Sequence, residues 1–171
     1  MGRYRDAHND LAGPSFAADL HVALWRGLTE ATLENWSASR TYLAQAMPVL
    51  KKYQPEWRTR VRLTDAQAAL GIGKLELADA AMMRVPHDLD RREALEAELI
   101  KARIEAAENH YPAAIPHFAA VENGGDEHIA AQAIFYQTSA ALTAGAITPK
   151  QGIAILERLR YRWRGDALEM K

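Results

Sequence analysis

Apolar residues recur along this chain at the three- and four-residue steps that define one face of an amphipathic helix. Two stripes show this spacing most clearly: Leu95, Leu99, Ala102 and Ala106, and Ile129, Ala133, Tyr136 and Ala140. No run of β-branched residues alternates with polar ones, as a half-buried strand would require. The pattern therefore predicts an all-α chain, in which every helix needs a neighbour to cover its apolar face.

Helices and turns can be placed from this pattern and from the positions of glycine, asparagine and proline. The predicted helices span residues 15–32, 36–52, 56–70, 74–84, 90–108, 111–122, 126–144 and 149–162. The predicted turns lie at Glu34-Asn35, Gly71 to Gly73, Asn109-His110, Asn123 to Gly125 and Gly145 to Thr148. Helices of these lengths, joined by short turns, favour antiparallel pairs.

Two helix starts are marked by residues that can cap a helix. Asp90 is followed three residues later by Glu93. Thr148 is followed by Pro149 at the first helical position and by Gln151 at the third. Each arrangement can satisfy backbone N–H groups that the start of a helix leaves free. We therefore expect one helix to begin directly after Asp90 and another after Thr148.

A recurring frame combines a large residue, a small residue three positions later and an apolar residue four positions further on. It is occupied by Tyr4/Ala7/Leu11, Trp36/Ser39/Leu43, Leu75/Ala78/Met82, Tyr111/Ala114/Phe118 and Pro149/Gly152/Leu156. The small residues are spaced by 32, 39, 36 and 38 positions, close to the period of roughly 34 residues in helical-hairpin repeats. A small residue here would let the second helix of a hairpin approach the first closely.

With these motifs the chain resembles a divergent tetratricopeptide (TPR) repeat array. The family pattern places Gly at a helix–turn–helix corner, an aromatic residue two positions on, then Ala, then a bulky residue. It is carried here by Gly2-Arg3-Tyr4 with Ala7, Glu34-Asn35-Trp36 with Ser39, Gly73-Lys74-Leu75 with Ala78, and Asn109-His110-Tyr111 with Ala114. The resemblance spans nearly the whole chain. The first helices match more weakly than the second ones, which leaves a related helical-hairpin solenoid open.

The resemblance implies one right-handed α-solenoid domain over residues 1–171, with about four hairpins. These would lie at roughly 15–52, 56–84, 90–122 and 126–162, with half-repeats at both ends. In this frame Gly2-Arg3-Tyr4 is the middle of a hairpin, and residues 161–171 begin a further first helix. We therefore expect a fragment of a longer array, whose uncapped ends can stack end to end on another copy.

The function implied by the resemblance is a protein–protein interaction or scaffolding module that binds a peptide or partner protein along a concave groove. The groove positions of the first helices carry over to His21, Arg60, Gln67, Glu96, Arg103 and Gln137. Neighbouring groove positions are occupied by Leu24, Leu28, Leu63 and Leu99. These leucines depart from the Lys and Asn pattern with which family members clamp a terminal carboxylate. An extended or helical segment with apolar and acidic groups fits better.

Two other classes of function stay open: a helical accessory domain of a larger enzyme, and a nucleic-acid-binding helical repeat. Lys plus Arg number 21 against 22 for Asp plus Glu, so no net positive field attracts nucleic acid. The segment from Arg158 to Arg164 interleaves arginine with aromatic residues, but its arginines fall on different faces of a helix. We expect no nucleic acid as partner, and we expect the four tryptophans to serve packing.

The segment Gly71-Ile72-Gly73-Lys74 invites comparison with a phosphate-binding loop. That loop needs a preceding strand, a first glycine where this chain has Ala68, and Ser or Thr where it has Leu75. The segment instead predicts a hairpin turn, in which a glycine ends one helix with positive φ and Gly73 opens the next helix.

Catalytic, metal and membrane signals are weak throughout the chain. The chain has no cysteine, and its six histidines form no HExxH motif; His110 with His117, and Asp126 with His128, offer at most two ligands. The row Glu93, Glu96, Glu105 and Glu108 is typical of a solvated helix face. We therefore expect no enzymatic activity, no metal and no cofactor. No apolar run approaches the roughly 18 residues of a membrane span, and the first residues are too polar for a signal peptide, so the sequence predicts a soluble segment whose compartment stays open.

Overall fold

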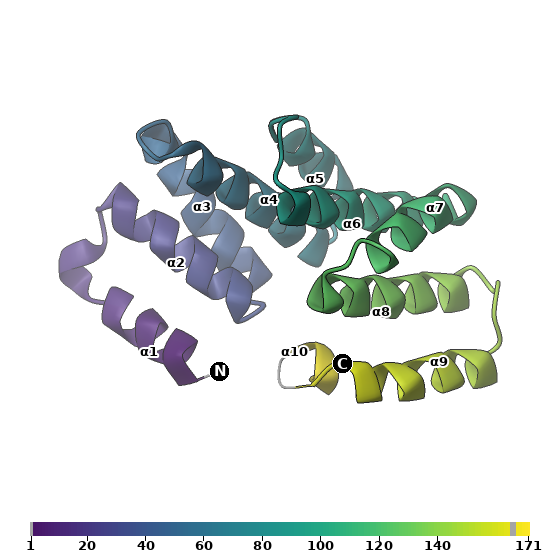
Figure 1. The fold of residues 1–171 in the computed structure, drawn as a ribbon. Helices are drawn as coiled ribbons and strands as arrows, with labels where there is room; N and C mark the ends of the chain where they lie inside the picture. The colour runs from purple at the N-terminus through teal and green to yellow at the C-terminus, as the bar shows by residue number, and fades with distance from the viewer. Residues whose placement is uncertain (1, 165–166) are drawn as a thin grey trace. The chain divides into compact units, whose positions relative to one another are not determined.

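The computed structural model describes residues 2–164 and 167–171, and in these ranges the chain is helical, without a strand. The helices are α1 (Gly2–Leu11), η1 (Pro14–Phe16), α2 (Leu20–Thr32), α3 (Trp36–Leu50), α4 (Pro55–Gly71), α5 (Leu75–Met82), α6 (Arg91–Ala107), α7 (Tyr111–Glu122), α8 (Glu127–Thr143), α9 (Pro149–Arg162) and α10 (Ala167–Met170) (Figure 1). The all-α prediction is confirmed. Over the described residues, none of these helices has the length and apolar character needed to cross a membrane.

The helices gather into two compact units, Met1–His87 and Asp88–Lys171. In unit 1, α2 packs along α3 and also touches α4, and α4 packs on α5. In unit 2, α6 packs along α7 and touches α8, and α8 packs on α9. The division falls between the second and third predicted hairpins, so each unit contains two of them.

The hairpin turns lie where the sequence predicts them. Five residues there adopt left-handed backbone conformations: Glu34 (φ 60°), Gly73 (φ 70°), Asn109 (φ 65°), Gly125 (φ 84°) and Gly145 (φ 67°). Such a residue just beyond a helix reverses the chain and satisfies free carbonyl groups of the last turn. Gly73 was expected to open a helix but is instead the left-handed residue of its turn; α4 ends at Gly71 and α5 begins at Leu75.

The predicted helix starts are confirmed to within one residue, with one exception. Both expected capping boxes form: the Asp90 side chain accepts from the Glu93 N–H, and the Thr148 side chain accepts from the Gln151 N–H. The predicted helix start at residue 15 is wrong by five positions, because α2 begins at Leu20. The Asp19 carboxylate caps α2 there, and the preceding Pro14–Phe16 segment makes a separate 3₁₀ turn.

The hairpin of α2 and α3 is held by a very close helix crossing. The Ser39 hydroxyl donates to the Gly27 carbonyl at 2.8 Å, and both residues are buried. A Cβ atom at Gly27 would lie only 2.5 Å from Leu43 Cδ2. Two small residues therefore let the backbones approach, and Leu43 fills the remaining space beside them.

The same principle holds in the other hairpins. Ala78 of α5 and Ala114 of α7 are fully buried, and Gly152 of α9 lies against the Leu142 side chain. Gly71 likewise permits a contact, because a Cβ atom there would meet the Trp36 ring at 2.3 Å. Four of the five small residues of the recurring frame, Ser39, Ala78, Ala114 and Gly152, are thus buried, whereas Ala7 of α1 is only half-buried.

The first helix is attached to unit 1 through polar contacts. The His8 ring nitrogen Nδ1 lies 2.6 Å from the buried Glu30 carboxylate of α2, which also accepts from Asn35 at 2.7 Å. The Arg26 guanidinium donates to the Leu11 carbonyl at the end of α1. Tyr4 remains 50% exposed, as expected for a helix covered on one side.

The further helix predicted at residues 161–171 includes positions 165–166, which lie outside the described residues. The short helix α10 follows these two positions and spans four residues.

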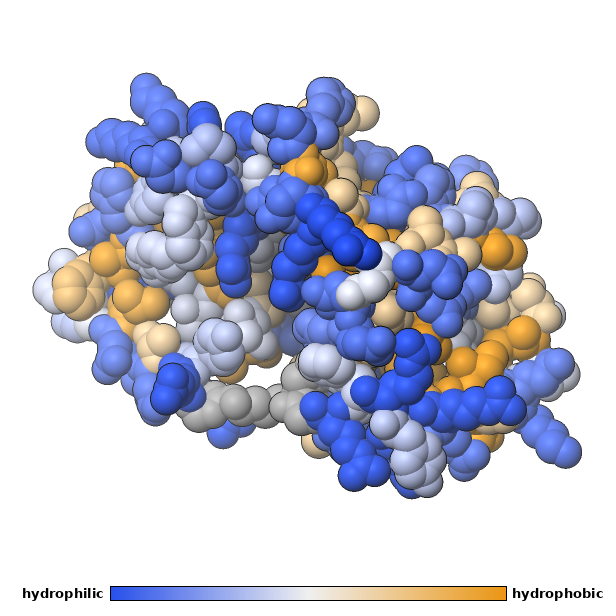
Figure 2. Space-filling view, in the orientation of Figure 1, coloured by the Kyte–Doolittle hydropathy of each residue, from blue (hydrophilic) through white to orange (hydrophobic). Residues whose placement is uncertain are grey.

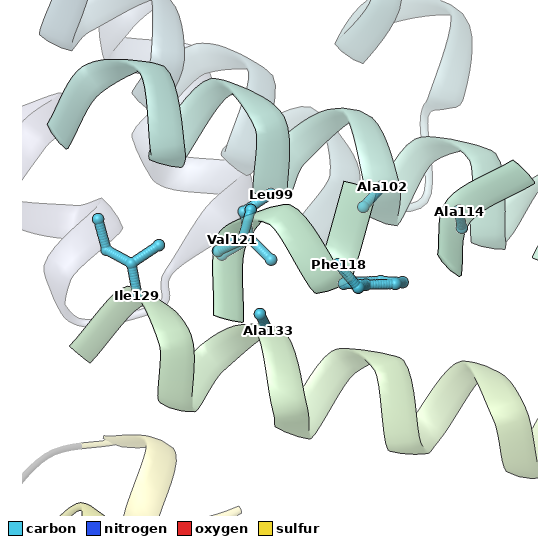
Figure 3. Packing of buried hydrophobic residues seen from close by; sticks show 7 residues of the cluster. All are labelled: Leu99, Ala102, Ala114, Phe118, Val121, Ile129 and Ala133. Atoms are coloured by element: carbon cyan, nitrogen blue, oxygen red, sulfur yellow. The ribbon is translucent and has the colours of Figure 1, made fainter. Parts of the chain in front are cut away.

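The core of unit 2 joins three helices. It consists of Leu99 and Ala102 from α6, Ala114, Phe118 and Val121 from α7, and Ile129 and Ala133 from α8. Phe118 and Val121 point between α6 and α8 (Figure 3). Leu95, Ala106 and Tyr136 pack at the edge of this cluster. The two apolar stripes predicted from the sequence therefore meet in one core.

Enlarging a crossing residue should destabilise unit 2. Ala114→Leu would force side-chain atoms into a filled core, so we expect the free energy of unfolding to fall by about 1–3 kcal/mol. Ala113→Leu, on an exposed position of the same helix, should change it by about 0.5 kcal/mol or less. Urea denaturation of both variants measures the difference. Equal effects of the two substitutions would show that Ala114 does not sit at a close crossing.

Candidate functional site

Unit 1 carries an exposed cluster of rings, here called the aromatic surface. Its residues are His21 and Trp25 from α2, Tyr53 from the α3–α4 connection, and Trp57 and Arg60 from α4. His21 and Trp25 stand one turn apart on α2, and Trp57 and Arg60 one turn apart near the start of α4. Helical spacing therefore aligns each pair, and the packing of α2 against α4 brings the two pairs together.

Trp25 and Trp57 form the centre of this surface. Their ring centroids are 4.8 Å apart in an edge-to-face arrangement, and the Arg60 guanidinium lies 5.7 Å from the Trp57 ring. Trp25 is 38% exposed, so part of this large ring is open to solvent. Each ring restricts the other, so the exposed indole is presented in a fixed orientation.

His21 and Tyr53 extend the surface. The Tyr53 hydroxyl lies 2.8 Å from His21 Nδ1, and the two ring centroids are 5.6 Å apart. Burial, together with the nearby Asp19 carboxylate, raises the pKa of Tyr53 above its ordinary value. The hydroxyl therefore keeps its proton and can donate a hydrogen bond to the imidazole nitrogen.

Two of the predicted groove residues, His21 and Arg60, belong to the aromatic surface. Gln67 lies two turns beyond Arg60 on α4 and is partly buried. Trp25 and Trp57 were expected to serve packing alone. The sequence does contain an indication that Trp25 lies at the surface. Trp25 follows the predicted groove residue His21 by four positions and so shares its helix face.

The other predicted groove residues lie in unit 2. The Arg103 guanidinium of α6 stacks over the Tyr136 ring of α8 at 3.9 Å. Glu96 pairs with Arg92, four residues earlier on the same helix, at 3.2 Å. Gln137 follows Tyr136 on α8 and is partly buried. Arg103 is thus committed to an intramolecular contact, whereas Trp25 in unit 1 keeps exposed ring surface.

Three of the histidines considered as metal ligands contact other side chains. His117 contacts Glu98 and, through Nε2, Glu105 at 3.4 Å. His128 stacks on Trp163 with centroids 4.6 Å apart, and His110 lies 3.5 Å from Glu108. Across the described residues, no group of three or more potential ligands has an arrangement suited to a metal ion.

The basic segment near the end of α9 is tied to its own unit. Arg162 pairs with Glu127 at 3.4 Å and with Glu122 at 3.9 Å. Arg164 donates to the Arg160 carbonyl at 3.2 Å. Much of this charge is therefore engaged inside unit 2.

A buried charge pair lies deeper in unit 1, between α3 and α4. Arg40 Nε is 3.8 Å from the Asp65 carboxylate, too far for a hydrogen bond, and this nitrogen has no hydrogen-bond partner among the residues that the structure describes. Burial raises the pKa of Asp65 above its ordinary value, although Arg40 and Arg84 act in the opposite direction. The ionised carboxylate is therefore less favourable in the folded protein than in water.

No protein-family model, curated protein or solved structure matches this chain. The function is therefore inferred from the exposed residues of the two units. On the face seen in Figure 2, hydrophilic residues cover much of the surface and hydrophobic ones show between them. Aromatic rings beside an arginine are side chains of the kind that recur in protein interfaces.

The Asp65 carboxylate should make stability depend on pH in a defined direction. The pKa of Asp65 in the folded protein lies above its unfolded value of 3.8, so the folded state holds the proton more tightly. The free energy of unfolding therefore falls as the pH rises from the unfolded pKa through the folded pKa. Asp65→Asn should remove that loss. Urea denaturation from pH 4 to 7 should therefore show wild type losing stability relative to Asp65→Asn as pH rises.

Asp88→Asn, at an exposed position, is the control for removing one negative charge. If wild type gained stability over Asp65→Asn with rising pH, the pairing with Arg40 would outweigh burial and the assigned direction would be wrong.

Proposed function

We propose that this chain is a TPR-like array of helical hairpins that binds a peptide segment of a partner protein, with the aromatic surface as part of the binding site. The observation that carries the proposal is the exposed Trp25 ring, fixed against Trp57 beside Arg60. Tryptophan and arginine are the residues that most often dominate the energy of protein interfaces. Mutual packing of the rings lowers the entropy lost when a partner binds.

The helix packing within each unit is compatible with this proposal. The first helix of one hairpin contacts the first helix of the next, as α2 does with α4 and α6 with α8. The buried small residues Ser39, Ala78 and Ala114 recur at equivalent places of successive second helices. Stacked hairpins of this kind expose the free faces of their first helices, and His21, Trp25, Trp57 and Arg60 all lie on such helices.

The chemistry of the surface favours a particular partner. The rings of Trp25 and Trp57 offer contact area for apolar side chains. Arg60 and His21 offer hydrogen-bond donors at either side, and Arg60 is permanently charged. An extended or helical segment that places an apolar residue next to Asp or Glu would satisfy both parts of the surface.

Selection of peptides from a displayed random library tests the proposal. We expect selected sequences to combine apolar and acidic residues, and to bind Trp25→Ala at least about tenfold more weakly than wild type. Arg60→Ala should also weaken binding, and it removes no buried group. Fluorescence anisotropy with a labelled peptide gives the dissociation constants, and circular dichroism checks that the variants fold.

Tyr161→Ala is the matched control, because it removes an exposed aromatic ring from α9 of unit 2. It should leave peptide affinity unchanged. The proposal would be contradicted by selected peptides that bind wild type, Trp25→Ala and Arg60→Ala equally well, or by a library that yields no binding peptide.

A further inference from the structure

Unit 1 contains a second feature, a cavity of about 200 Å³ with cationic walls. Its charged lining residues are Lys51 at the end of α3, Arg58, Arg62 and Asp65 on α4, and Arg84 just beyond α5. The remaining lining side chains are apolar and come from α3 and α5. One cavity thus collects four positive groups and one carboxylate from three packed helices.

In the described part of the chain, these four cations lack a close ion-pair partner, although Arg84 acts on the Asp65 carboxylate at longer range. Among the described residues, none of Lys51, Arg58 and Arg62 forms an ion pair within 4.0 Å, and neither does Arg84. The single carboxylate, Asp65, lies nearest to Arg40, which is not one of the lining residues. The whole chain carries a formal charge of only -1, so this excess of positive charge is local.

The cavity is separate from the aromatic surface. Arg58, Arg62 and Asp65 follow one another at four- and three-residue steps and so share one face of α4. Arg60 lies on the opposite face of the same helix, and Trp57 lies about 100° around the helix axis from Arg58. The two faces can therefore be occupied and altered independently.

The positive charge of the lining residues indicates an anionic ligand. Guanidinium groups present planar pairs of N–H donors that match phosphate oxygens, and several of them together favour an anion with more than one charge. Four cations against one carboxylate leave three positive charges, more than a single carboxylate ligand would balance. The apolar part of the lining reduces screening by water and strengthens this attraction.

We propose that this cavity binds a phosphate group, held by Arg58, Arg62 and Arg84 with Lys51 at its edge. Asp65 opposes the bound anion, and the raised pKa of its carboxyl reduces that opposition as the pH falls. The shared chemistry is the phosphate itself, supplied either as a free ion or on a phosphorylated side chain of another protein.

Isothermal titration with inorganic phosphate and with pyrophosphate, at constant ionic strength set by sodium chloride, tests the proposal. We expect saturable binding to wild type and at least about tenfold weaker binding to Arg62→Gln, because a charged hydrogen-bond partner is lost. Lys51→Gln, at an exposed position, should weaken binding in the same direction without disturbing the packing. Asp65→Asn should strengthen it.

Arg60→Gln is the matched control, since it removes the same charge from the opposite face of α4. Unchanged affinity in Arg60→Gln supports the proposal. Equal weakening in Arg60→Gln and Arg62→Gln would overturn it in favour of unspecific charge attraction. Absence of binding at about 10 mM phosphate or pyrophosphate would also overturn it, since even a millimolar site would then be mostly filled.

A second titration distinguishes the sources of the phosphate. A serine phosphopeptide that binds much more tightly than inorganic phosphate would assign the cavity to a phosphorylated protein, and its unphosphorylated form should not compete. Equal affinities would assign the cavity to the free ion. Because the peptides of the aromatic surface depend on Trp25 and those of the cavity on Arg62, each proposal can fail while the other stands.

Discussion

The structure depends on close approach of the two helices within each hairpin, and that approach depends on small residues at the crossing. In the first hairpin, Gly27 leaves no room for a Cβ atom beside Leu43, and Ser39 satisfies its own hydroxyl on the Gly27 carbonyl. Ala78 and Ala114 hold the corresponding positions in later hairpins and are also fully buried. Burial of a polar hydroxyl is tolerated in the first crossing because its hydrogen bond is made. In unit 2, the larger Phe118 side chain fills space in the core that also contains Ala114.

Most of the helices and turns could be predicted because their signals are local. Helix stripes, capping boxes and left-handed turn residues act within a few positions of each other, and Asp90, Thr148 and Gly145 each acted as the sequence indicated. The start of α2 was misplaced because Phe16 and Ala17 look helical, whereas the Asp19 side chain begins the helix only at Leu20. A cap competes with helix propensity, and a single hydrogen-bonding side chain can decide the boundary.

The candidate binding residues were only partly predictable, because they depend on contacts between helices distant in sequence. His21 and Arg60 were placed by repeat phase, but the pairing of Trp25 with Trp57 joins positions on α2 and α4 that no local pattern connects. The cationic cavity was missed for a related reason. Arg58 and Arg62 lie one turn apart on α4, and only the packing of α3 and α5 against α4 adds Lys51 and Arg84 to their face.

Substitution of Gly27 tests the close crossing most directly. Helix propensity alone would make Gly27→Ala stabilising by about 1 kcal/mol, whereas a Cβ atom 2.5 Å from Leu43 Cδ2 should make it destabilising. The cost should shrink in a Leu43→Ala background, with a coupling energy of about 0.5–3 kcal/mol in a double-mutant cycle of urea unfolding. A stabilising Gly27→Ala substitution, or strictly additive effects of the two changes, would contradict this account of how the hairpins are held.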